Sequence, residues 1–335
     1  MKDLSEGMAV DSPSNLIKRG EVLDSIRDDR LVIVTGTGVS MHSLGQPSPG
    51  TELAGWPGLL RHGLNHCLSL RLITKEEAEI VELQIKNGTT DYLIDAAQKI
   101  HDCLDKRENE RYWWMKESIG QLKVSEPGLI QAIHRLNGLI ATLNYDGLLR
   151  EVTGRPALHW RQQTEITSYL RSHSKEFILH LHGQWEVPDS IVLDRKSYEE
   201  ISGDVKMQDL LRRFARFETI LFIGCGQTFF DPNFQTLLNW AHEALEGVEH
   251  RHFIFCRQSE EPSILSALQP HGYLATLVYG QDYSDLTPFI EALGEEGGAS
   301  AAAANPPLTA GTRTRATKSA KPLTPAELWK LQSQR

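Results

Sequence analysis

The 335-residue sequence has little cysteine and no long apolar run, and both facts narrow the class of protein. Its four cysteines are scattered and no Cys-x-x-Cys pair occurs, which argues against a structural zinc ribbon and favours reduced thiols. No apolar segment approaches the roughly 20 residues that span a bilayer, and the N-terminus shows no apolar signal region. We therefore expect a cytoplasmic protein with no membrane partner.

Positive charge is also scarce over most of the chain. The formal net charge is −9, but residues 297–335 hold six basic side chains against one acidic side chain, a balance of +5. The remaining residues therefore carry −14. An acidic body argues against nucleic acid as the main ligand.

Short apolar runs alternate with segments of helical periodicity through residues 1–294. The runs cover residues 31–35, 139–143, 177–181, 220–223, 252–256 and 275–278, and the helical segments between them include 209–214 and 234–245. Runs that are apolar throughout are typical of strands covered on both faces. The pattern predicts an α/β fold with a doubly wound, Rossmann-like parallel sheet of about six strands.

A helical insertion is expected after the first strand. Roughly a hundred residues separate the first two apolar runs, which is too many for one crossover helix. Segments 74–88 and 90–106 are amphipathic, and their plausible caps are Thr74, Thr90 or Asp91, and Gly88. A third segment, 110–123, carries Tyr112, Trp113 and Trp114, which we interpret as core residues. We expect the insertion, at about 56–128, to form one wall of a cleft beside the sheet.

The C-terminal region differs in composition from the body. Residues 295–322 are small and polar, which predicts a disordered linker. Thr324, Pro325 and Glu327 then form a capping box with proline at the first helical position. Residues 323–335 are therefore predicted to form a short amphipathic helix. This helix is either a frayed terminus or a segment that docks on a protein partner or a neighbouring subunit.

The first apolar run leads into a glycine-rich loop, Gly36-Thr37-Gly38-Val39-Ser40. Met41 stands where the dinucleotide fingerprint has its third glycine, and no Lys-Ser/Thr pair follows, so the loop is not a P-loop. A glycine pair at this place either makes a tight turn or brings backbone N–H groups to a phosphate.

Polar residues and glycines also follow the next three runs, where open parallel sheets bind ligands. They are Asn144 and Asp146 after the second run, His182 after the third, and Gly224, Gly226, Gln227 and Thr228 after the fourth. Singly, Asn144 could cap a helix with Asp146 in its first turn, and His182 could be a satisfied polar residue. His180 and His182 share a face, but no further ligand stands at metal spacing, so no metal is expected. Together these strand ends describe a dinucleotide site that contains an imidazole.

The motifs TGTGVS, TLNYD, HLHG and FIGCG, in this order, resemble the Sir2 superfamily over roughly residues 28–290. Within it, the chain is similar to a branch of bacterial anti-phage SIR2-like proteins and their animal relatives of the FAM118 type. That branch shares the HxHG strand and the FxGCG turn followed by an aspartate, here Asp231. The stretch LDRKSYEEI, with Asp194 and Tyr198, matches the same branch.

Two departures from the protein deacylases of this superfamily bear on activity. No cysteine lies between His182 and Gly224, where the deacylases carry a four-cysteine zinc module. The stretch SMHSLGQPSPGTELAGW replaces the Pro-Asp-Phe-Arg type of segment that follows their glycine loop. Without the zinc module one wall of the acyl-lysine channel is missing, so the resemblance favours cleavage of NAD itself over deacylation.

The resemblance implies NAD as substrate and a role for each motif. Asn144 would face the nicotinamide ribose and position water, and Asp146 would hold the nicotinamide amide or a ribose hydroxyl. His182, with an ordinary pKa of about 6.5, would be the general base. The remaining assignments are pyrophosphate for Gly36, Thr37, Gly38 and Ser40, the adenosine ribose for Gly224, Gly226 and Gln227 or Thr228, and the adenine for Tyr279.

We therefore expect an NAD+ glycohydrolase that releases nicotinamide and ADP-ribose, acting in anti-phage or innate immune-type defence. An unregulated NAD-consuming enzyme is toxic to its own cell, and the resemblance implies activation by assembly or by a partner, as is typical of that branch. We therefore expect a homo-oligomer, with the C-terminal region or the helical insertion as the contact, that assembly or a protein partner activates. Three alternatives stay open. They are a non-catalytic sensor that binds NAD or ADP-ribose, a scaffold with a vestigial pocket, and an NAD-dependent protein deacylase.

Overall fold

The structure is a computed structural model that describes residues 10–45, 49–226, 252–268 and 274–298. Several sequence predictions lie outside these residues. They are the helical segment 234–245, Gln227, Thr228 and Asp231, nearly all of the linker 295–322, and the C-terminal helix 323–335.

Seven strands of the described residues form one sheet in the order β3-β4-β2-β1-β5-β6-β7, and every pairing is parallel. They are β1 (Leu31–Thr35), β2 (Leu139–Thr142), β3 (Ala157–His159), β4 (Ile178–His180), β5 (Thr219–Ile223), β6 (His252–Arg257) and β7 (Leu274–Gly280). The predicted α/β class and parallel sheet are confirmed. Sequence reasoning missed β3, because three residues at the sheet edge are too few to show a pattern.

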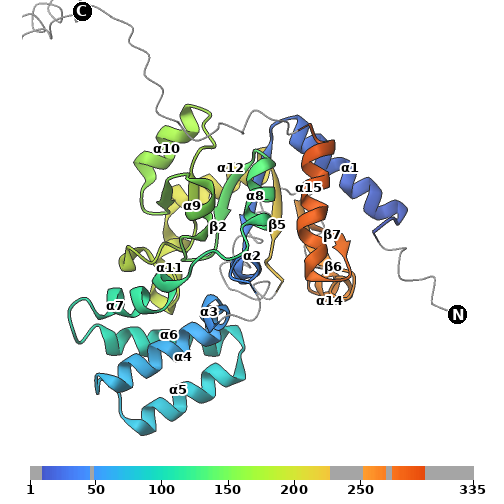
Figure 1. Cartoon of the computed structure of the whole chain (residues 1–335). Coiled ribbons are helices and arrows are strands. Elements are labelled where there is room, and N and C mark those ends of the chain that lie inside the picture. Colours follow the sequence, from blue (N-terminus) through green and yellow to red (C-terminus); the bar gives the residue numbers. More distant parts are fainter. Residues whose placement is uncertain (1–9, 46–48, 227–251, 269–273, 299–335) are drawn as a thin grey trace, which may run out of the picture. The chain divides into compact units, whose positions relative to one another are not determined.

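The strand order creates a crevice at the centre of the sheet. The chain builds β2, β3 and β4 on one side of β1 and then crosses over to build β5, β6 and β7 on the other side (Figure 1). Thr35, at the end of β1, is in register with Thr142 and Ile223 of the two neighbouring strands. The loops after these three strands therefore start at one point, where open α/β sheets bind their ligands.

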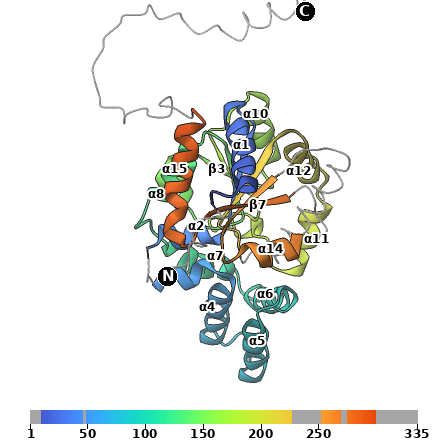
Figure 2. The same cartoon turned by 90° about the vertical axis from the view of Figure 1, so that its right-hand side faces the viewer.

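Helices cover both faces of the sheet, as Figure 2 shows with β7 toward the viewer. Ile33 packs into one core with α1, α2, α8, α9 and α15, and its neighbours Val32 and Val34 pack into a second core with α10, α11, α12 and α14. This alternation is what a strand buried on both faces requires.

The helices that pack into the core of Ile33 are α1 (Pro13–Arg27), α2 (Thr37–Ser43), α8 (Gly128–Arg135), α9 (Leu148–Thr153) and α15 (Leu286–Glu296). The helices of the second core are α10 (Gln163–Arg171), α11 (Arg195–Gly203), α12 (Val205–Phe217) and α14 (Glu261–Leu268), with 3-10 turns at Pro188–Ser190 and Tyr283–Asp285.

The helices between α2 and α8 extend to one side of the sheet (Figure 1). They are α3 (Pro49–Ala54), α4 (Trp56–Ser69), α5 (Lys75–Asn87), α6 (Thr90–Leu104) and α7 (Glu110–Glu117), followed by the 3-10 turn η1 (Ile119–Gln121). Thr74 caps α5 through a capping box, and Gly88 ends it at φ 74°, both as predicted. The N-cap of α6 is Thr89, which keeps an extended backbone, so Thr90 and Asp91 are helical residues rather than caps.

The aromatic triplet of α7 divides between core and surface. Trp114 is fully buried, and Gly63 of α4 makes room for it, because a Cβ there would lie 2.8 Å from the Trp114 ring. Trp113 is 44% exposed, and Tyr112 is half-buried. The prediction of core residues is therefore confirmed for Trp114 and wrong for Trp113, because the short helix turns only one side toward α4 and α6.

All four cysteines are buried with free thiols. Over the described ranges, the helices lack the combination of length and apolar character that crossing a bilayer takes.

Candidate functional site

The glycine turns after β1 and β5 bind each other. The Gly36 N–H donates to the Ile223 carbonyl and the Gly38 N–H donates to the Gly224 carbonyl, both at 2.9 Å. A Cβ on Gly36 would lie 2.6 Å from the Gly224 oxygen, and one on Gly38 would lie 2.9 Å from the Gly224 backbone. Gly224 itself has φ +70°, a conformation that favours glycine. These three glycines allow two backbones to touch.

This contact changes the predicted phosphate site. The two N–H groups that were assigned to a pyrophosphate already have carbonyl partners. Ser40 is 3% exposed and does not line the cavity described below. Thr37 is half-buried and does line it, so Thr37 is the residue of this loop that the structure brings to the candidate site.

Ser40 joins the loop after β1 to the loop after β2. The Asn144 side-chain amide donates to the Ser40 hydroxyl at 2.8 Å and to the Gly36 carbonyl at 2.9 Å. The Ser40 hydroxyl in turn donates to a carboxylate oxygen of Asp146 at 2.6 Å. The other Asp146 oxygen accepts the Leu148 N–H at 3.0 Å, so Asp146, rather than Asn144, supports the start of α9. Burial raises the pKa of Asp146, and the hydrogen bond from Ser40 opposes this shift.

Asn144 is fixed through its backbone as well. Its N–H donates to the Thr142 hydroxyl at 3.1 Å, and its carbonyl accepts from Nδ1 of His180 at 2.9 Å. The amide oxygen Oδ1 is buried and has no hydrogen-bond partner among the described residues. A buried acceptor without a partner is rare and marks a place for a donor from a ligand or water.

His182 lies beside Asn144 at the neighbouring strand end. Thr142 and His180 are register partners, and Asn144 and His182 each stand two residues beyond them. The His182 carbonyl accepts the Val192 N–H at 2.9 Å, and the imidazole is 2% exposed. Burial lowers the pKa of His182 to about 3, well below the ordinary value that we expected from sequence. The ring is therefore neutral at neutral pH.

His180 has a different role from His182. Burial lowers its pKa to about 4, and its Nδ1–H is engaged by the Asn144 carbonyl, which fixes the tautomer. His180 thus holds the backbone of Asn144 in place. Over the parts of the chain that the structure describes, no group of three or more His, Cys, Asp or Glu side chains is arranged to hold a metal ion.

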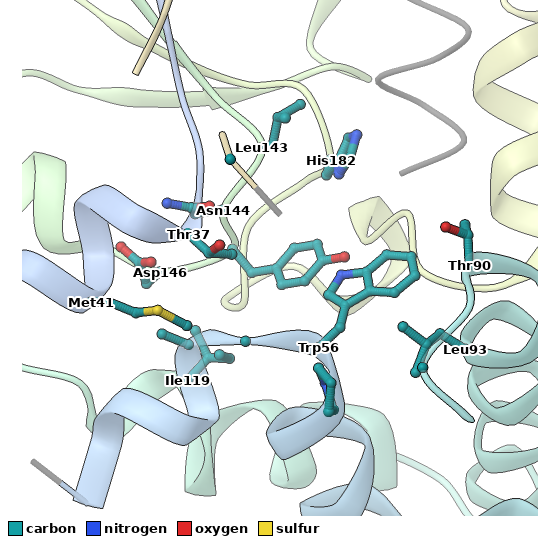
Figure 3. Close-up of a pocket in the computed structure, with 16 residues that line it drawn as sticks. Thr37, Met41, Trp56, Thr90, Leu93, Ile119, Leu143, Asn144, Asp146 and His182 are labelled. Carbon is teal, nitrogen blue, oxygen red and sulfur yellow. The ribbon is translucent and has the colours of Figure 1, made fainter. Parts of the chain in front are cut away.

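A cavity of about 360 Å³ lies over these strand ends (Figure 3). The sheet side contributes Thr37, Leu143, Asn144, Tyr145, Asp146, His182 and Gly226, and α2 contributes Met41. The insertion contributes Ala54, Gly55, Trp56, Pro57, Gly88, Thr90, Leu93 and Ile119. The sheet side is mainly polar and the insertion side is mainly apolar. The insertion thus forms a wall of the site, as the sequence predicted.

The structure leaves some predicted residues away from this cavity. Gly36, Gly38 and Gly224 belong to the interlocked turns and do not line it, whereas Gly226 does. Tyr279 is 6% exposed in β7, where it packs into the first core and where burial raises its pKa. It does not line the cavity, so the structure gives no support to its assignment to adenine.

Sequence reasoning missed the aromatic side of the site. The Tyr198 ring of α11 lies between two cavity-lining rings, 6.3 Å from His182 in an edge-on arrangement and 6.2 Å from Trp56. Trp56 follows Gly55, the N-cap of α4, so it stands at a helix start, where hydrophobic periodicity carries no information. The Gly-Trp-Pro sequence there was the one local feature that could have drawn attention to Trp56.

Residues 138–274 match a family model described as SIR2-like domain. The matched range contains Asn144, His182, Gly224 and Gly226, and it begins after the glycine loop of β1. The tertiary structure adds that loop to the matched part through the contacts of Gly36, Gly38 and Ser40. Over this range the chain is similar to SIR2-like domains, whose superfamily includes NAD-dependent enzymes.

Proposed function

We propose that this protein is an NAD+ glycohydrolase that cleaves the bond between nicotinamide and ribose. The observation that carries the proposal is the position of Asn144 and His182 on one cavity, where the Asn144 Oδ1 is buried without a described partner. The SIR2-like match supports NAD as the ligand, because members of this superfamily bind NAD. The residues present suit a sugar: an amide oxygen and a neutral imidazole both accept hydrogen bonds from hydroxyl groups.

The reaction needs little acid chemistry. The bond from C1′ of the ribose to the pyridinium nitrogen breaks, and its electron pair goes to that nitrogen, so nicotinamide leaves neutral. A water oxygen then bonds to C1′, and one proton is released to give ADP-ribose. Unlike ordinary glycosidases, such a site needs no carboxylic acid to protonate the leaving group. Its work is to orient the ribose and place the water.

Asn144 and His182 have separate roles in this proposal. The Asn144 amide is held by Gly36 and Ser40, so its oxygen is preorganised to accept a hydrogen bond from the ribose or the attacking water. His182 is neutral and accepts a proton from that water or from a ribose hydroxyl. Its lowered pKa makes it a weak base, yet a weak base suffices here, because water that bonds to a cationic C1′ becomes strongly acidic.

The apolar wall of the insertion limits access of bulk water to the reacting centre. Trp56, Leu93 and Ile119 face the cavity from this side. Exclusion of water strengthens each polar interaction of the sheet side and prevents side reactions.

The direct test is release of nicotinamide from NAD by the purified full chain, followed by chromatography. Asn144→Ala and His182→Ala are each expected to lower the turnover number by about 10²-fold or more. Tyr169→Phe, a change on α10 away from the cavity, is the control and is expected to retain activity. If the two cavity variants release nicotinamide at the wild-type rate, the assignment is wrong.

The same samples separate the other functions. NAD binding without release favours the sensor. Release that requires an acetylated peptide and yields acetyl-ADP-ribose favours the deacylase, and absence of both binding and release favours the scaffold.

The defence role and activation by assembly are parts of the proposal that rest on the family resemblance alone. A full chain with Leu328→Ala and Trp329→Ala, compared with wild type by size-exclusion chromatography, tests the C-terminal segment as the assembly contact.

A further inference from the structure

The helical insertion is joined to the wall behind His182 at the start of α11. Nδ1 of His101, on α6, and a carboxylate oxygen of Asp194 are 2.5 Å apart in a hydrogen bond. Both side chains are almost fully buried, at 3% and 4% exposed. The His101 ring also lies edge-on to Trp114, 5.7 Å away, in the core of the insertion. The bond therefore links that core to α11.

Two further contacts of the same helices are weaker. Arg195 pairs with Asp95 at 2.7 Å, and the Lys196 N–H reaches the Gln98 side-chain oxygen at 3.4 Å. The Arg195 and Asp95 side chains are about half exposed, and pairs of this kind contribute little. The buried bond of His101 with Asp194 is the one whose loss leaves a charge inside the protein.

Asp194 also sets the start of α11. Its second carboxylate oxygen accepts the Ser197 N–H at 2.8 Å, and its own N–H donates to the Ser197 hydroxyl at 3.1 Å, which completes a capping box. Burial by itself raises the pKa of Asp194, but the hydrogen bonds from His101 and Ser197 outweigh it and hold the pKa well below its usual range. Asp194 is therefore a carboxylate that binds the insertion with one oxygen and α11 with the other.

The position of Asp194 is transmitted to His182 by two short routes. Tyr198, four residues further along α11, packs edge-on against the imidazole. Val192, two residues before Asp194, donates its N–H to the His182 carbonyl and accepts from the Tyr145 hydroxyl at 2.8 Å. A shift of Asp194 thus displaces both supports of His182.

We propose that His101 and Asp194 form a clasp that positions His182 in the candidate site. The proposal rests on the function proposed above for its kinetic consequence. His101 and Asp194 do not line the cavity, so both are positioning residues and not catalytic ones. The clasp also ties α6, whose first turns carry the cavity residues Thr90 and Leu93, to the sheet side of the site.

Hydrogen exchange of the free full chain tests the clasp without any need for activity. His101→Phe keeps a ring against Trp114 and removes the hydrogen bond, and Asp194→Asn keeps the cap and removes the charge. Both variants are expected to exchange faster at residues 182–203. Asp95→Asn, which removes the exposed contact between the same helices, is the matched control and is expected to exchange like wild type. Unchanged exchange in His101→Phe overturns the clasp.

Nicotinamide release then tests positioning. His101→Phe is expected to lower kcat by about 10²-fold with KM nearly unchanged, since a displacement of about 1 Å costs that much. Asp194→Asn should lose less than Asp194→Ala, and if Asp194→Ala does not fold, the other two variants decide. If His101→Phe exchanges faster but keeps the wild-type kcat, the contact of His101 with Asp194 is structural only and does not position His182. A wild-type chain that releases no nicotinamide rejects the proposed function, whereas the exchange result still decides the clasp.

Discussion

The turns after β1 and β5 and the turns after β2 and β4 lie at the same edge of one sheet, but they use their polar groups differently. In the first pair, backbone N–H groups of Gly36 and Gly38 bind carbonyls of the opposite turn. In the second pair, side chains of Asn144 and His182 reach the cavity. The difference teaches that the glycine pattern here reflects close packing of two backbones, whereas the polar residues face the candidate site.

Among the predictions, a substitution in the first pair of turns is expected to have the largest effect, and the effect is on stability. Gly224→Ala places a Cβ 2.6 Å from the Val39 nitrogen at φ +70°, so we expect a loss of about 2–4 kcal/mol in the free energy of unfolding. Gly226→Ala meets its nearest atom at 3.8 Å and is the matched control, with an expected change within about 0.5 kcal/mol. Denaturant unfolding measures both. Equal losses would mean that contact between the turns is not what requires glycine at 224.

Ser40, which connects the two pairs, predicts an intermediate effect. Ser40→Ala removes the donor to Asp146 and the acceptor for Asn144, both buried, at an expected cost of about 2 kcal/mol. Ser43→Ala, on the same helix, is the control, since that hydroxyl only donates to the Val39 carbonyl. Denaturant unfolding curves of the two variants measure both losses of free energy. If Ser43→Ala costs as much as Ser40→Ala, the bridge between the loops contributes no special stability.

Changes in the second pair are expected to act on the pH dependence of stability, with an effect that is small at neutral pH and grows as the pH falls. Burial lowers the pKa values of His180 and His182 to about 4 and about 3, against about 6.5 in the unfolded chain. Between these values the unfolded chain binds protons that the folded chain does not. The contribution of these two histidines to stability is therefore fully present above about pH 6.5 and falls toward pH 4, by at most about 1.4 kcal/mol per pH unit for each histidine.

His180→Asn, which keeps a donor for the Asn144 carbonyl, tests this dependence through the free energy of unfolding between pH 4.5 and pH 6.5. We expect its slope against pH to be smaller than that of wild type by about 1 kcal/mol per unit on average over this range. Parallel slopes would show that His180 titrates alike in the folded and unfolded chains.

Much of the fold could be predicted because it depends on local pattern. Six strands were marked by apolar runs, and Thr74 and Gly88 were recognised as caps, since caps and runs are short-range features. The edge strand β3 and the Thr89 cap were missed, because three residues or two adjacent threonines give no decisive local preference.

The site was predicted in part for the same reason. Position after a strand was enough to select Asn144 and His182, and the cavity includes both. The same reasoning also selected Gly36, Gly38 and Tyr279, which do not line the cavity, because a sequence does not show which backbone or core a residue faces. Sequence reasoning could not identify Trp56 and Tyr198. Their ring contacts with each other and with His182 bring together three segments that are distant in the sequence.

The sequence by itself determined the parallel α/β fold and the identity of the polar residues at the strand ends, because apolar runs and strand ends can be read within a few residues. Only the tertiary structure decided that the Gly36 and Gly38 N–H groups are engaged, that His182 is neutral, and that the insertion closes the cavity. Each of these depends on long-range packing: two turns in contact, an imidazole removed from water, and helices brought over the sheet edge.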